Sequence, residues 1–141
     1  MTDPEANVEL VAKLAGSEAS RLLLDNRIGI EFQRDQQRTT LFIESTVQFH
    51  DGSSRYEICP DNPVQYGPLA SLLKRRVRSA RVTESGSLRV EMHPEGSILI
   101  EPDDNYEAWE LIQANGARCI CIPGGGLAIW DASGRAGDDQ L

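Results

Sequence analysis

Short segments in which apolar and polar residues alternate run along most of this chain, and they constrain its fold more than any other feature. Ile28, Ile30 and Phe32 alternate with small or polar residues, and Leu41 and Ile43 do so again. Alternation with a period of two is typical of a β-strand that buries one face. Similar segments predict strands at 19–24, 47–49, 56–58, 77–82, 88–92, 98–100, 106–112, 118–122 and 127–130.

Turn signals separate these segments and favour antiparallel pairing of neighbours. Asp51-Gly52 is a strong signal for a tight hairpin turn. The remaining turns are expected at 85–86, 94–96, 115–116 and 123–126. A weak repeat is also visible, because 28–32 resembles 88–92 and 41–44 resembles 98–101. Two similar meanders could bury their apolar faces against each other, although chance similarity between amphipathic strands is an alternative.

The fold class that follows is mainly β, a β-sandwich or partly open barrel built from antiparallel meanders, with one or two short helices. A chain of 141 residues with 40% hydrophobic residues has the material for one domain. We expect this domain at 17–130, after an N-terminal segment 1–16 and before a flexible acidic tail at 131–141. Asp3-Pro4 and Gly16 predict a helix within the N-terminal segment, and Pro68 predicts a second one near 68–76.

The charge of the chain argues against some classes of partner. Fourteen basic and 22 acidic residues give a formal net charge of −8, which opposes binding to nucleic acid or to an anionic membrane. One basic cluster departs from this balance and could contact an acidic partner, an anionic ligand or a second copy in a homodimer. Its alternative role is the charged end of a helix and a guarded edge strand. The cluster comprises Lys74, Arg75, Arg76, Arg78 and Arg81.

An acidic and aromatic segment near the C-terminus is the main candidate site. Acidic side chains around exposed aromatic residues suit a protein-binding surface, since the aromatics anchor a partner and the charges steer a basic one. The competing interpretation places both Trp109 and Trp130 in the core. The candidate binding residues are Glu101, Asp103, Asp104, Tyr106, Glu107, Trp109 and Glu110.

Cysteines, histidines and a glycine-rich turn give weaker signals. Cys59, Cys119 and Cys121 could form a zinc site only if their strands were neighbours, and their spacing is not that of a zinc motif. Buried core thiols are the favoured interpretation, so we predict neither a metal nor another cofactor. His50 and His93 both stand at turns without a nucleophile motif, and the glycines at 124–126 are explained by a tight turn.

The C-terminal third carries two motifs that resemble those of a known family. Tyr106-Glu107-Ala108-Trp109-Glu110-Leu111 is followed by Pro123-Gly124-Gly125-Gly126-Leu127-Ala128-Ile129-Trp130. This combination is similar to the ending of a family of small uncharacterised proteins, found mainly in actinobacteria, and looser similarity extends over 14–130. The resemblance implies a shared fold and supplies no catalytic residues, because the function of the family is unknown.

Two classes of function are compatible with these sequence features. The first is a non-enzymatic protein-binding domain, of which a toxin-neutralising immunity protein is one form. The alternative is a small-molecule-binding domain or enzyme with a site inside the β-structure, lined by the tryptophans, cysteines or histidines. The odd number of cysteines, and the lack of a signal peptide or membrane span, favour a cytoplasmic location.

Overall fold

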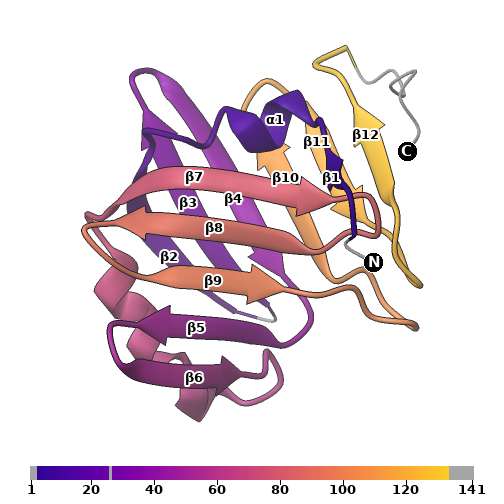
Figure 1. Cartoon of the computed structure of the whole chain (residues 1–141). Helices are drawn as coiled ribbons and strands as arrows, with labels where there is room; N and C mark the ends of the chain where they lie inside the picture. The colour runs from indigo at the N-terminus through magenta and orange to yellow at the C-terminus, as the bar shows by residue number, and fades with distance from the viewer. Residues whose placement is uncertain (1–2, 26, 134–141) are drawn as a thin grey trace.

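The computed structural model describes residues 3–25 and 27–133, and these residues are mainly β (Figure 1). The predicted tail lies mostly outside the described residues. The elements in chain order are β1 Glu5–Ala6, α1 Glu9–Ala12, β2 Glu18–Leu24, β3 Ile28–Arg34, β4 Gln37–Ile43, β5 Val47–Asp51, β6 Ser54–Ile58, the 3-10 helix η1 Pro63–Leu72, β7 Arg76–Thr83, β8 Leu88–His93, β9 Ser97–Ile100, β10 Trp109–Gln113, β11 Arg118–Cys121 and β12 Leu127–Trp130.

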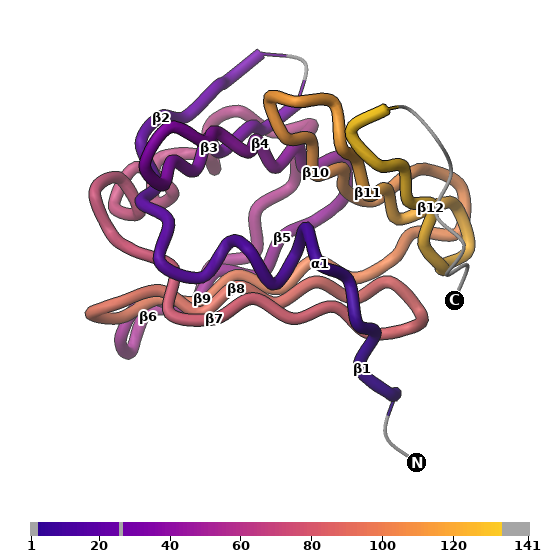
Figure 2. Tube along the Cα trace, turned by 90° about the horizontal axis from the view of Figure 1, so that it is seen from above, coloured from indigo at the N-terminus to yellow at the C-terminus, as the bar shows by residue number. Residues whose placement is uncertain are grey.

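These strands form one open antiparallel sheet that folds over into two layers. The order along the sheet is β12-β11-β10-β4-β3-β2-β7-β8-β9-β5-β6, and β1 pairs with β7 beside it. The sheet turns at the junction of β2 and β7, where the pairing is reduced to Glu18 and Arg76. Figure 2 shows the layer from β2 to β12 lying over the layer from β7 to β6. The mainly β fold predicted from the alternation is confirmed.

Two three-stranded meanders, β2-β3-β4 and β7-β8-β9, have matching strand registers. Each carries a bulge near the start of its first strand, after Ala19 in β2 and after Val77 in β7. After each meander the chain crosses to the other layer, so that β5 pairs with β9 and β10 pairs with β4. The structure therefore contains the same arrangement of strands twice. A duplication of the sequence itself stays a prediction.

The core lies between the two layers and is built from the inward positions of the alternation. Phe32, Phe49 and Trp109 are the largest of its fully buried side chains. The interior aliphatic residues from the strands are Ile28, Ile30, Leu41, Ile43, Val47, Ile58, Val77, Val82, Leu88, Val90, Ile98, Ile100, Leu111 and Leu127. Burial of these faces supplies the main driving force for folding.

Both predicted helices differ in extent from those observed. Asp3 does not cap the N-terminal helix. The chain after Asp3 forms β1, which pairs with β7, and Val8 is the N-cap of the four-residue α1. The carboxylate of Asp3 instead accepts a hydrogen bond from the Ser85 hydroxyl, which holds the pKa of Asp3 below its usual range. The helix predicted near 68–76 is the 3-10 helix η1, which has a proline inside it. It ends at Leu72, before the basic residues, and the last three of these lie on β7.

Trp109 ties the two layers together at one end of the sandwich. Its side chain is fully buried on β10, and its indole N–H donates a hydrogen bond of 2.8 Å to the carbonyl of Gly86. Gly86 lies in the turn between β7 and β8, which belongs to the other layer. The contact therefore combines a large apolar area with a satisfied polar group.

Replacement of this side chain should lower stability far more than the same change at Trp130, which is half-buried. Trp109→Phe removes the hydrogen bond and leaves a void, so the free energy of unfolding should fall by about 2–4 kcal/mol. Trp130→Phe should cost less than about 1 kcal/mol, as is usual outside the core. Urea unfolding followed by circular dichroism measures both values, and equal losses would contradict this role for Trp109.

Candidate functional site

The acidic segment before β10 is an ordered loop and not the start of a strand. The Asp103 carboxylate accepts hydrogen bonds from the backbone N–H groups of Asn105 at 2.8 Å and Tyr106 at 3.1 Å. The carbonyl of Asp103 also accepts a bond from the N–H of Gly124, which joins this loop to the turn between β11 and β12. Asp103 therefore fixes the shape of the loop, and β10 begins only at Trp109.

Four of the predicted binding residues lie exposed on this loop. Glu101, Asp104 and Glu107 are open to solvent, and Tyr106 is 67% exposed. None of these three carboxylates forms an ion pair with any residue that the structure describes. We refer to residues 101–107 as the acidic loop. It presents uncompensated negative charge around one exposed aromatic ring.

Trp109 and Glu110 do not belong to this surface, which corrects the predicted set. Trp109 points into the core, and Glu110 is 5% exposed on the opposite side of β10. The two side chains diverge because neighbouring residues of a strand point to opposite faces. Glu110 takes part in a different cluster, on the outside of its layer.

The outer face of the layer formed by β2, β3, β4, β10, β11 and β12 is rich in apolar side chains. Figure 2 shows no helix of the described chain over it. The strand register places its side chains in two rows across the sheet. They are Leu23, Gly29, Phe42, Glu110, Ile120 and Ala128 in one row, and Arg21, Glu31, Thr40, Ile112, Arg118 and Trp130 in the other. We call this surface the arginine-aromatic face.

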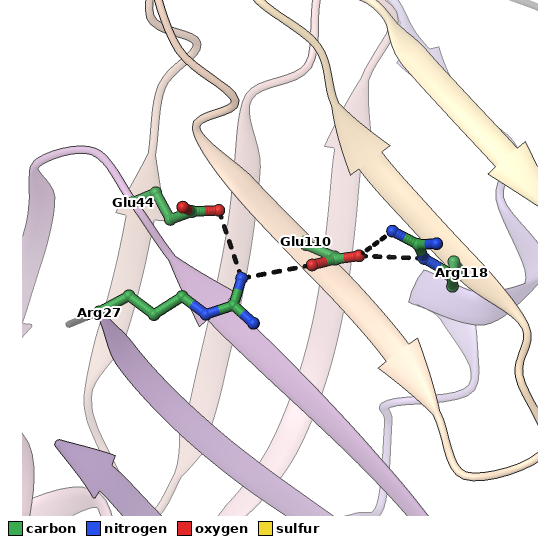
Figure 3. A network of polar contacts seen from close by, with 4 residues as sticks. All are labelled: Arg27, Glu44, Glu110 and Arg118. Carbon is green, nitrogen blue, oxygen red and sulfur yellow. Dashed lines mark hydrogen bonds and ion pairs between the residues drawn. The ribbon is translucent and has the colours of Figure 1, made fainter. Parts of the chain in front are cut away.

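A charged network crosses the middle of this face (Figure 3). Arg27 lies 3.4 Å from one carboxylate oxygen of Glu110 and 3.5 Å from Glu44. Arg118 donates two hydrogen bonds, of 2.5 and 3.0 Å, to the other oxygen of Glu110. Both oxygens of this nearly buried carboxylate are therefore paired with guanidinium groups, as burial of a charge requires.

Each of these arginines also lies over an aromatic ring. The guanidinium carbon of Arg27 is 3.7 Å from the ring centre of Phe42, and that of Arg118 is 5.2 Å from the ring centre of Trp130. Phe42 packs directly over Gly29, where a Cβ would lie only 3.1 Å from the ring. A glycine at this position therefore lets the ring and its arginine lie flat against the sheet. Cation-π contacts of this kind hold both partners in place.

The family of unknown function DUF6188 matches residues 10–131, which include both the acidic loop and the arginine-aromatic face. This chain belongs to that family. No curated protein and no solved structure matches the chain. No helix of the described part of this DUF6188 chain is long and apolar enough to cross a membrane.

The cysteines of this DUF6188 chain do not come together. Cys119 and Cys121 are buried in the core, where burial raises the pKa of Cys119 to about 12 and that of Cys121 to about 11. Cys59 follows β6, which lies at the opposite end of the sheet from β11. Within the described ranges no three possible ligands form a metal-binding group. The two buried thiols remain protonated at neutral pH and pack as apolar residues.

The predicted basic cluster is divided between two environments. Arg75 is mostly buried and forms an ion pair of 2.8 Å with Asp51, and this hydrogen bond holds the pKa of Asp51 below its usual range. Arg76, Arg78 and Arg81 point outward from β7. Their exposed side chains therefore leave a smaller basic surface than the sequence implied.

The residues proposed for the alternative site inside the β-structure do not line a common cavity. His50 and His93 are exposed, and His93 lies 3.5 Å from Arg78. A groove of about 580 Å³, which has Trp130 in its lining, opens to solvent between α1 and the ends of β10 and β12, and a second of about 640 Å³ lies beside Arg34 and Arg76. Neither groove is lined by a cysteine or a histidine.

Arg27, Phe42 and Arg118 were not among the site residues predicted from the sequence of this DUF6188 chain. A signal was present, because Phe42, Ile112 and Trp130 occupy outward positions where alternation predicts polar residues. The ion pairs were not predictable, since the two arginines come from segments 91 residues apart that only the tertiary pairing brings together.

Glu110 should contribute more to stability than Glu44, although both contact Arg27. Glu110→Gln removes the charge that two arginines share, and the free energy of unfolding should fall by about 1–3 kcal/mol. The lower half of that range is expected, since Arg27 and Arg118 are 36% and 43% exposed and regain water. Glu44→Gln should cost less than about 0.5 kcal/mol, as for exposed ion pairs. Urea unfolding at neutral pH tests this, and an equal effect of the two changes would argue against a central role for Glu110.

Proposed function

We propose that this protein is a non-enzymatic protein-binding domain whose acidic loop docks on a basic partner protein. The observation that carries the proposal is Tyr106, which is 67% exposed between the exposed carboxylates of Asp104 and Glu107. An aromatic anchor within a charged rim is a common arrangement at protein interfaces. Asp103 supports it further, because the hydrogen bonds it accepts order the loop before binding and so lower the entropic cost.

The charge of the loop favours a basic partner. Glu101, Asp104 and Glu107 have no ion-pair partner among the described residues, so a cation on another protein can pair with them without breaking an existing contact. The net charge of −8 adds long-range attraction for the same kind of partner. Association should accelerate at low salt for this reason.

A toxin-neutralising immunity protein is one specific form of this function. Such a protein would cover a basic surface of its toxin with an acidic surface of its own, and a small domain with a preorganised acidic loop fits that task. Family membership adds no support for this form, since the family has no known function. We place the protein in the cytoplasm as part of the same proposal, because its three free cysteines would stay reduced there.

Affinity capture from a lysate of the source cells tests the proposal, with Asp104→Lys/Glu107→Lys as the loop variant. Glu57→Lys/Asp61→Lys is the matched control, because it changes the charge equally at two exposed positions away from the loop. The wild type and the control should retain a stoichiometric basic partner, and the loop variant should bind it about tenfold less tightly or worse. Loss of binding in both variants, or in neither, would count against the acidic loop.

A further inference from the structure

We infer that the arginine-aromatic face is a second docking surface, and that it takes an acidic protein segment with apolar side chains. This surface is separate from the acidic loop, and the most exposed charged side chains of its ion pairs are arginines. Three features of the face lead to this inference: the depth at which its charges lie, the apolar area between them, and the rigidity of its arginines.

Two of the carboxylates of the face lie beneath its cations, whereas Glu44 is about as exposed as Arg27. The side chains of Arg21, Arg27 and Arg118 are 60%, 36% and 43% exposed. Their partners Glu31 and Glu110 are only 11% and 7% exposed. An approaching partner therefore meets three guanidinium groups and one accessible carboxylate, that of Glu44, and each guanidinium has N–H groups left over to bind a further carboxylate.

Apolar side chains fill the spaces between these arginines. Phe42, Ile112 and Trp130 are half-buried on the outer side of the sheet, which no helix of the described chain covers. Apolar side chains that lie between exposed polar groups are a common feature of binding surfaces. Arginine and tryptophan are also the residue types enriched at the centres of protein interfaces.

The arginines are held in position before any partner arrives. Arg27 is stacked on Phe42 and paired with Glu110, and Arg118 is paired with the same carboxylate and lies over Trp130. Side chains that are already ordered lose less entropy on binding than free ones do. The network therefore acts as a preformed platform for carboxylates.

Charge also decides between the possible occupants. A second copy of the chain would bring the same three exposed arginines against themselves across a two-fold axis, with only Glu44 as an accessible carboxylate in the network. A nucleic acid would offer no aliphatic side chains to Leu23 and Ile112. An acidic segment with apolar residues matches both the charge and the apolar area of the face.

The test uses Ile112→Glu, which places a carboxylate next to Arg118 on the face. The matched control is Leu99→Glu on the outer face of the other layer. Leu99 is likewise half-buried, and its cross-strand neighbour is also an arginine, Arg89. The probe is a synthetic peptide of alternating glutamate and leucine, titrated into the full chain and followed by the NMR shifts of the Trp130 indole N–H and of the amides of β4, β10 and β11.

The peptide should produce saturable shifts at these positions and none at Tyr106, and the shifts should weaken as salt is added. Ile112→Glu should weaken binding about tenfold or more, while Leu99→Glu should leave it unchanged. Trp130→Ala provides a second variant with the same expected loss. The inference is overturned if the face does not respond, if a peptide of lysine and leucine or a single-stranded oligonucleotide binds there equally well, or if the face instead mediates self-association. Binding by the acidic loop is unaffected by any of these results.

Discussion

Burial of the apolar faces of the two meanders against each other is the interaction on which the rest of this structure depends. The sheet folds at the short junction of β2 and β7, and this fold brings the inward side chains of both layers into one core. Because side chains alternate strictly along a strand, the choice of inward residues also fixes which residues face outward. The surface residues of the protein are therefore a consequence of how its core is arranged.

Two neighbouring residues of β10 illustrate this dependence. Trp109 points inward and joins the layers through Gly86, so Glu110 must point outward into the arginine-aromatic face. A shift of the register by one residue would expose the tryptophan and bury the carboxylate without its arginines. The energetic penalty for both changes explains why this part of the sheet has a single register.

The two surfaces that result differ in both charge and construction. The acidic loop lies outside the sheet and is ordered by the hydrogen bonds that Asp103 accepts, and the exposed carboxylates of Glu101, Asp104 and Glu107 form no ion pair with the described residues. The arginine-aromatic face lies on the sheet itself, and the carboxylates of Glu31 and Glu110 are neutralised beneath its arginines. A domain with two such surfaces could contact a basic and an acidic protein at once, which agrees with the proposed role in protein binding.

The sequence predicted the fold class and most strands because alternation is a local property. The hairpin at Asp51-Gly52 and the strand pair that begins at Ile28 are found as expected. The acidic segment was partly misread, since periodicity alone cannot show that Asp103 ends the extended conformation through its side chain. Trp130 was not recognised as outward-facing for a similar reason: its neighbour Ile129 is also apolar, so alternation does not say which of the two enters the core.

Selective quenching of tryptophan fluorescence tests the central claim, that exposed arginines cover neutralised carboxylates beside Trp130. Trp109 is fully buried, so quenching by ions in solution reports on Trp130. At low ionic strength, the ratio of iodide to caesium quenching should be several-fold higher for this emission than for N-acetyltryptophanamide, because a local positive potential concentrates anions near the ring. A ratio equal to or below that of N-acetyltryptophanamide would contradict the account.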